Sequence, residues 1–232
     1  VTADGQPVGL ILDKSKGLAL GSDVALNGSF STDTVWTKAA GWSISGGVAT
    51  FTPGTNGYLS QVIAGIANKT LKMTFTVVSG TIVLGSNYTA GGTFTAGTYT
   101  VYVRPLFNVI DFWANSSSSI DNVSAQIVAG NHALQATAAA RPLLKVTGLC
   151  KWDDFDAVDD VLNATFPSSL GSSCTVARGN VGAAPTILTG QTIGTSYADS
   201  TDNCGLIIVN RALTGQETAD LTAWLTAKGA TS

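Results

Sequence analysis

The chain has 232 residues, of which 44% are hydrophobic and 12% are charged, so it can form one or two packed domains and is not a disordered segment. Its formal net charge of −3 offers no basic surface to a phosphate backbone, and we therefore expect no nucleic acid among its partners. One histidine (His132) and one glutamate (Glu217) leave little from which to build a catalytic triad or a multi-histidine metal site, so we predict that the protein is not an enzyme.

Composition favours an all-β fold, because the chain has 26 glycines and few good helix formers. The first 21 residues contain one apolar run, residues 8–12, which ends in a polar turn. No apolar run in the chain approaches the roughly 20 residues that a membrane-spanning helix needs. We therefore expect no membrane insertion.

Short strands separated by turns follow one another from about residue 27 to residue 128, which is the pattern of a β-sandwich or barrel. Gly46 and Gly47 separate two short strands and predict a hairpin with a two-residue turn. Apolar and polar residues alternate over residues 71–77, and again over 98–103, 110–114 and 123–127. Each of these segments is expected to bury one face and expose the other.

The last hundred residues add further short apolar runs and one amphipathic helix. Thr214 and Glu217 have the spacing of a capping box, in which each side chain accepts a hydrogen bond from the other residue's backbone amide. Gly229 is the expected C-cap. The apolar face of this helix consists of Leu221, Trp224 and Leu225.

The three cysteines, Cys150, Cys174 and Cys204, have no CxxC spacing, which excludes a zinc ribbon. Two interpretations stay open. The cysteines are ordinary buried thiols, or Cys174 and Cys204 form a disulfide.

Four strings resemble the concanavalin A-like, laminin-G-type domains of tailed-phage and prophage virion proteins: VTADGQPVGLILDKS from Val1, GNHALQATAAARP from Gly130, FDAVDD from Phe155 and IIVNRALT from Ile207. In that family the DKS turn usually runs directly into the GNHA string. Here more than a hundred residues intervene. The resemblance implies that residues 1–21 and 130–232 form a shortened, discontinuous sandwich with residues 22–129 inserted into one of its surface turns.

The intervening segment resembles jelly-roll carbohydrate-binding modules, through the strings NGSF at residues 27–30, WSISGGVAT at 42–50 and SIDNVS at 119–124. The two resemblances together imply two β-sandwiches, one inserted in the other, with one C-terminal helix. Carbohydrate-binding jelly rolls stack sugar rings on exposed aromatic side chains. Trp42, Tyr99 and Phe112 are in phase with apolar neighbours and are expected in the core. The candidate ligand-binding residues are Trp36, Tyr88 and Tyr102.

Modules of this shape often carry a structural calcium between their first and last strands, and Asp121 matches the aspartate of the closing strand. Ser31 stands where an acidic residue commonly follows the NGSF-type string, which removes one hard oxygen ligand. A structural calcium on Asp121 is the only cofactor that the resemblance implies, and a turn role is its alternative. For the acidic cluster Asp153, Asp154, Asp156, Asp159 and Asp160, the resemblance implies a strand end and turn whose carboxylates bond the local backbone.

The resemblance implies a structural protein on the phage virion, as a tail fibre, spike or capsid-attached appendage that displays a host-attachment, glycan-binding sandwich. Its expected partners are other virion proteins, host cell-surface glycan and further copies of itself as a homo-oligomer. A second hypothesis is a decoration or assembly module without a ligand. A third is the accessory carbohydrate-binding module of a secreted bacterial enzyme.

Overall fold

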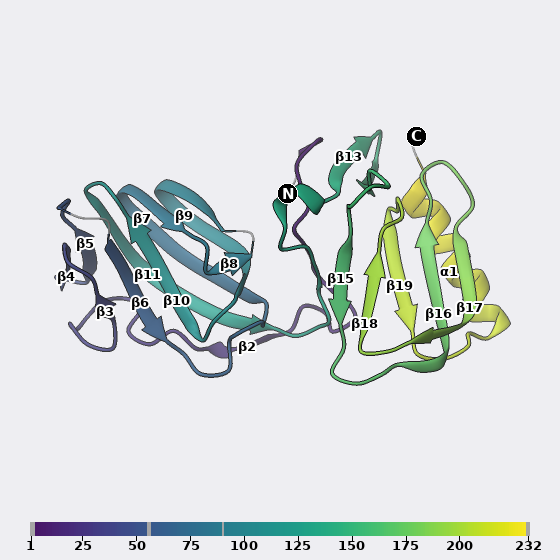
Figure 1. Ribbon diagram of the computed structural model, residues 1–232, viewed down its shortest axis with the longest axis horizontal. Coiled ribbons are helices and arrows are strands. Elements are labelled where there is room, and N and C mark those ends of the chain that lie inside the picture. The colour runs from purple at the N-terminus through teal and green to yellow at the C-terminus, as the bar shows by residue number, and fades with distance from the viewer. Residues whose placement is uncertain (1–2, 55–56, 90, 231–232) are drawn as a thin grey trace. The chain divides into compact units, whose positions relative to one another are not determined.

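The computed structural model describes residues 3–54, 57–89 and 91–230 (Figure 1). The chain divides into two compact units: unit 1 comprises Val1–Leu12 and Asn131–Ser232, and unit 2 comprises Asp13–Gly130. Residues 13–21, which the sequence interpretation gave to the outer domain, lie in unit 2, because the Ala129 amide donates to the Ala19 carbonyl at 2.9 Å. Val1, Thr2 and Ser232, at the ends of the predicted outer domain, lie outside the described residues.

Unit 2 is a ten-stranded antiparallel sheet, counted over the described residues, in the order β3-β6-β10-β7-β11-β5-β4, with β9 beside β7, β8 beside β9 and β2 beside β11 (Figure 1). Its strands are β2 (Leu20–Asp23), β3 (Thr37–Lys38), β4 (Trp42–Ser45), β5 (Val48–Phe51), β6 (Gly57–Val62), β7 (Leu71–Leu84), β8 (Tyr88–Thr89), β9 (Gly92–Pro105), β10 (Val109–Ala114) and β11 (Ser118–Val128).

A bulge in β7 lets this sheet fold over on itself. Before the bulge β7 pairs with β11, and after it Val83 pairs with Trp113 of β10. The pairing of β7 with β9 shifts register between Val77 and Thr81. Gly80 has φ +72° there, and a Cβ on it would lie 2.1 Å from the Ser117 carbonyl oxygen, so only glycine fits this corner.

The interior of unit 2 is filled by the side chains that alternate along these strands. Phe75 and Phe112 are fully buried, and their ring centroids lie 5.4 Å apart with an angle of 65° between the ring planes. The predicted hairpin is confirmed, because Ser45 pairs with Val48 across Gly46 and Gly47, both of which have positive φ. Strand makes up 50% of the structure and helix 8%, so the predicted all-β, jelly-roll-like architecture with one C-terminal helix is confirmed.

Unit 1 contains three small sheets in its described part. The first has the order β1-β12-β15-β18, the second β17-β16-β19, and the third is the β13-β14 hairpin. Leu10 pairs with Leu134, which joins the N-terminal segment to the strand that follows unit 2. The elements are β1 (Leu10–Ile11), β12 (Ala133–Leu134), the 3-10 helix η1 (Ala138–Ala140), β13 (Leu143–Thr147), β14 (Cys150–Asp154), β15 (Leu162–Thr165), β16 (Gly171–Gly179), β17 (Thr186–Ile193), β18 (Ser196–Asp199), β19 (Gly205–Val209) and α1 (Gly215–Gly229).

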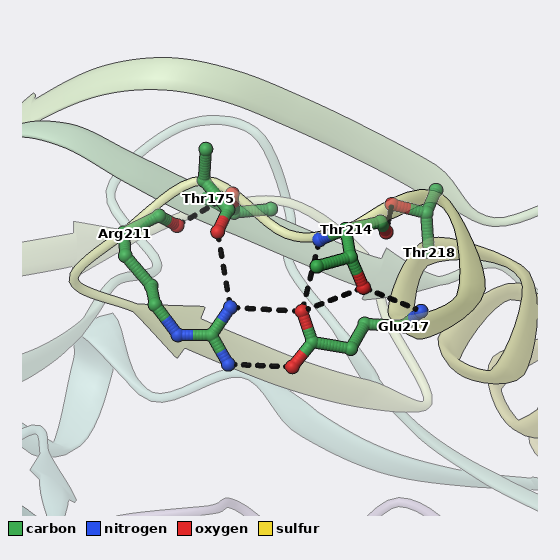
Figure 2. Close-up of polar contacts among 6 residues, drawn as sticks. Thr175, Arg211, Thr214, Glu217 and Thr218 are labelled. Carbon is green, nitrogen blue, oxygen red and sulfur yellow. Dashed lines mark hydrogen bonds and ion pairs between the residues drawn. The ribbon is translucent and has the colours of Figure 1, made fainter.

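The helix α1 begins at the predicted capping box, which Figure 2 shows. Thr214 Oγ1 accepts from the Glu217 amide at 3.2 Å, and Glu217 Oε2 accepts from the Thr214 amide at 2.9 Å. Both Glu217 oxygens also accept from the Arg211 guanidinium, at 2.8 and 2.6 Å, and this contact is the main reason why the pKa of Glu217 falls to about 2. The capping-box prediction is confirmed.

The far end of α1 differs from the prediction. Gly229 is the last helical residue and Ala230 is the C-cap. Gly229 packs against the backbone of Asn180, the residue that follows β16, and a Cβ on Gly229 would lie 2.0 Å from the Asn180 carbonyl oxygen. Of the predicted apolar face, Leu225 is fully buried whereas Trp224 is 48% exposed. In the described ranges, α1 and η1 are the helices, and neither is long and apolar enough to span a membrane.

The disulfide between Cys174 and Cys204 that the sequence left open is incompatible with this topology. The Cys204 amide donates to the Gly179 carbonyl at 2.9 Å at the end of β16, whereas Cys174 lies about five residues earlier on the same strand. At about 3.3 Å per residue the two cysteines are roughly 15 Å apart, well beyond the Cα separation of about 7 Å that a disulfide tolerates. All three cysteines are free thiols.

Candidate functional site

Two of the three predicted ligand-binding aromatics are core residues of unit 2. Trp36 is 6% exposed, packs on Phe30 with ring centroids 5.3 Å apart, and donates from Nε1 to the Asn27 carbonyl at 3.1 Å. Tyr88 is also 6% exposed, so neither side chain presents a ring face to solvent. The residues before Trp36, 31–35, do form an exposed loop, but the Trp36 side chain itself is turned into the core.

Tyr102 is partly exposed on β9, opposite Lys72 of β7. This position follows the predicted alternation, because Val103 next to it is buried. No aromatic ring stacks on Tyr102 among the described residues. The side chain is therefore an isolated surface tyrosine with no partner ring for a sugar platform.

Asp121 has its carboxylate directed to the next residue. One carboxylate oxygen accepts from the Asn122 amide at 2.6 Å and the other from Asn122 Nδ2 at 3.1 Å. Ser31, at the position where an acidic partner was expected, donates to Asn27 Oδ1 at 3.1 Å. Calcium takes six to eight oxygens, and these residues supply one carboxylate that already holds a turn, so they do not fit the implied calcium site.

In the acidic cluster of unit 1, Asp153 and Asp154 end β14, and Asp156, Asp159 and Asp160 belong to the turn that follows. Asp156 Oδ1 accepts from the backbone amides of Val158, Asp159 and Asp160 at 2.9, 3.2 and 3.3 Å, which lowers the pKa of Asp156. Ala157 inside this turn has φ +59°, the conformation that the glycine usual in this motif adopts without strain. The loop thus satisfies its own backbone amides with its carboxylates.

Two exposed aromatic side chains lie side by side on the outer face of unit 2. Tyr58 of β6 and Trp113 of β10 occupy directly opposed positions of the antiparallel pair, and their ring centroids are 5.5 Å apart. Each is 39% exposed. Ile110, Phe112 and Ala114 of β10 are buried, so the pleat turns Trp113 outward. This pair is the aromatic platform of the candidate site.

A buried polar network holds the Trp113 ring in place. Trp113 Nε1 donates to Asp111 Oδ2 at 2.8 Å, and Asp111 Oδ1 accepts from Asn87 Nδ2 at 3.0 Å. The Tyr88 hydroxyl accepts from the Asp111 amide at 2.7 Å and donates to the Asp111 carbonyl at 3.2 Å. Burial raises the pKa of Tyr88, so its hydroxyl stays protonated and keeps both hydrogen bonds. Tyr88 thus supports the aromatic platform from inside.

A hollow of about 300 Å³ adjoins the Trp113 side of the platform, lined by Val83, Gly85, Ser86, Trp113, Ala114 and Asn115. Gly85 has no side chain to cover the indole, and a Cβ there would lie 3.6 Å from Trp113 Cδ1. The exposed Ser86 and Asn115 add a hydroxyl and an amide beside the ring. The site therefore combines a fixed aromatic surface with hydrogen-bonding groups at its edge, the combination that binds sugar rings.

Trp113 has the same sequence signal as Tyr102, although it was not among the predicted ligand-binding residues. It lies between Phe112 and Ala114, on the polar phase of an alternating segment, which is the criterion that selected Tyr102. No signal in the chain pairs Trp113 with Tyr58, because the two residues meet only through the register of β6 and β10. No protein-family model and no curated protein matches the chain.

Proposed function

We propose that unit 2 is a carbohydrate-binding β-sandwich of a non-enzymatic tailed-phage virion protein, a tail fibre, spike or capsid-attached appendage that attaches to a host-surface glycan. The observation that carries the binding role is the exposed Tyr58–Trp113 platform, with its indole anchored by Asp111. The virion role rests on the resemblance of the four strings, most of whose residues belong to unit 1, to phage virion proteins.

The physical basis of binding is the match between an aromatic face and the apolar C–H face of a pyranose. Trp113 is fixed before a ligand arrives, so binding does not require the loss of its rotamer freedom. A platform of two rings open to solvent gives weak contacts, with dissociation constants on the order of millimolar. Display of many copies on a particle converts such contacts into useful avidity.

Binding is tested with the full chain, biotinylated and displayed on tetravalent streptavidin, against arrays of bacterial surface polysaccharides. We expect Trp113→Ala and Tyr58→Ala each to lower the apparent affinity about tenfold or more, equivalent to about 1.4 kcal/mol. Trp224→Ala is the matched control, because Trp224 is a similarly exposed tryptophan on α1 of unit 1. Equal binding by Trp113→Ala and the unmodified chain would contradict the proposal.

The virion role is tested in a phage or prophage genome that encodes the chain. Particles that carry Trp113→Ala are expected to assemble in normal numbers and to adsorb to host cells about tenfold more slowly. Adsorption at an unchanged rate would instead favour a decoration or assembly module. A chain found in the culture medium as part of a glycan-degrading enzyme, and missing from purified particles, would favour the accessory-module hypothesis.

A further inference from the structure

The unpaired positive charges of the sandwich in unit 2 gather at one end of β7 and β9. Between residues 22 and 129 the cationic side chains are Lys38, Lys69, Lys72 and Arg104. Lys38 forms an ion pair with Asp33, whereas none of the other three forms one with any residue that the structure describes. The sandwich therefore carries three cations that have no counter-ion of its own.

Strand register places these three cations close together. Lys72 of β7 and Tyr102 of β9 are directly opposed, so their Cβ atoms lie about 5 Å apart. Arg104 lies two residues beyond Tyr102 on the same face of β9, and diagonal neighbours of this kind are about 7 to 8 Å apart. The Asn68 amide donates to the carbonyl of the last residue of β9 at 2.8 Å, which holds the turn that carries Lys69 beside this end of the strand. Lys69, Lys72 and Arg104 form a basic patch beside the Tyr102 ring.

Arg104 is partly removed from water without gaining an anionic partner. It lies opposite Thr89 of β8, which is 5% exposed. Arg104 Nε is buried and has no hydrogen-bond partner among the described residues, and burial lowers the pKa of Arg104. A guanidinium that has lost part of its hydration is stabilised when a carboxylate binds beside it, because charge-assisted hydrogen bonds replace the lost water contacts.

The remaining carboxylates of residues 22–129 are engaged elsewhere. Asp111 and Asp121 take part in the hydrogen bonds described above. Asp23 of β2 lies in the same cross-strand row as Lys72, because Gln126 of β11 is opposite both residues. Two strand spacings of about 4.8 Å each separate Asp23 from Lys72, and Asp23 Oδ1 already accepts two backbone amides at 3.0 and 2.9 Å. The basic patch is therefore open to an anion from outside the chain.

We propose that the basic patch binds an acidic polysaccharide through the carboxylates of its uronic acid residues. Guanidinium and ammonium groups bind a carboxylate by charge-assisted hydrogen bonds. The Tyr102 ring offers an apolar face to one pyranose, and the directly opposed Thr74 and Thr100 continue the same face of the two strands with hydroxyl groups. A ring face beside a row of hydroxyls matches the C–H and O–H surface of a sugar chain better than that of an acidic peptide. The basic patch lies on β7 and β9 and does not depend on the Tyr58–Trp113 platform of β6 and β10.

Affinity electrophoresis of the full chain tests the proposal, with polygalacturonate in the native gel and each variant compared with its own mobility in a polymer-free gel. We expect the polymer to retard the unmodified chain at about 20 mM salt and to lose most of this effect at about 300 mM, because salt screens contacts between exposed charges. Lys72→Gln and Arg104→Gln should each raise the apparent Kd about threefold, and the double variant about tenfold. Lys72 is partly exposed, so Lys72→Gln tests the proposal even if Arg104→Gln lowers the stability of the fold. Equal mobility of the unmodified chain with and without polymer would overturn the proposal.

Lys38→Gln is the matched control, because it removes one positive charge from the same unit and leaves the basic patch intact. It should bind as the unmodified chain does, and a loss equal to that of Lys72→Gln would contradict the proposal, since net charge alone would then explain binding. Trp113→Ala should also keep the salt-sensitive binding. Its loss in Trp113→Ala would assign the polymer to the aromatic platform and overturn the separate site, without contradicting glycan binding by unit 2. Polyglutamate should retard the chain less than polygalacturonate does, and equal retardation would count against a saccharide ligand.

Discussion

Arg178→Met is expected to destabilise unit 1 by about 3 to 5 kcal/mol, because it leaves a buried carboxylate without its cation. Arg178 of β16 lies against Asp199 at the end of β18, with Nε and Nη2 both 2.9 Å from Asp199 Oδ1. Asp199 is 3% exposed, and its other oxygen accepts from Asn203 Nδ2 at 2.8 Å. Burial raises the pKa of Asp199 in spite of this ion pair, so the carboxylate depends on its partners.

Urea unfolding followed by hydrogen exchange of unit 1 peptides measures this loss separately from unit 2. The matched control is the double variant Arg178→Met, Asp199→Leu, which removes both charges and should recover most of the stability, since apolar side chains of similar volume often replace a buried ion pair at little cost. A loss below about 1 kcal/mol in the single variant would mean that water reaches Asp199 and that the pair contributes as little as a surface ion pair.

Asp153→Asn is expected to make unit 1 more stable at neutral and alkaline pH. Burial, followed by the nearby Asp199 carboxylate, raises the pKa of Asp153 from 3.8 to about 7. Between these two values the unfolded chain loses the Asp153 proton and the folded chain retains it. Stability therefore falls as the pH rises from about 4 to about 7 and is constant above that range, with a total loss of at most about 4 kcal/mol.

The pH dependence of urea unfolding distinguishes this titration from a general charge effect. Asp153→Asn should match the unmodified chain near pH 4 and exceed it by up to about 4 kcal/mol at pH 8. Asp154→Asn is the matched control on the same strand, since Asp154 Oδ2 lies 3.6 Å from Lys145 Nζ. The Asp154→Asn variant should keep the pH dependence of the unmodified chain. Parallel curves for Asp153→Asn and the unmodified chain would show that Asp153 ionises normally in the folded state.

Features that depend on near neighbours in the chain were predictable from the sequence. The Gly46–Gly47 hairpin follows from two glycines that adopt positive φ between short strands. The start of α1 follows from the three-residue spacing of Thr214 and Glu217. The buried face of β7 follows from alternation alone, because a strand turns successive side chains to opposite faces. Each of these signals is complete within a few residues.

The candidate site was decided by tertiary structure. Trp36 and Tyr88 have the sequence surroundings of exposed loop residues, yet both side chains are turned into the core of unit 2. Tyr58 meets Trp113 through a pairing between two strands that no local pattern relates. The sequence by itself determined the strands, the turns and the helix start, because those depend on local backbone preference and alternation. Which side chains share a surface was decided by long-range strand register and by the burial of apolar area over the whole unit.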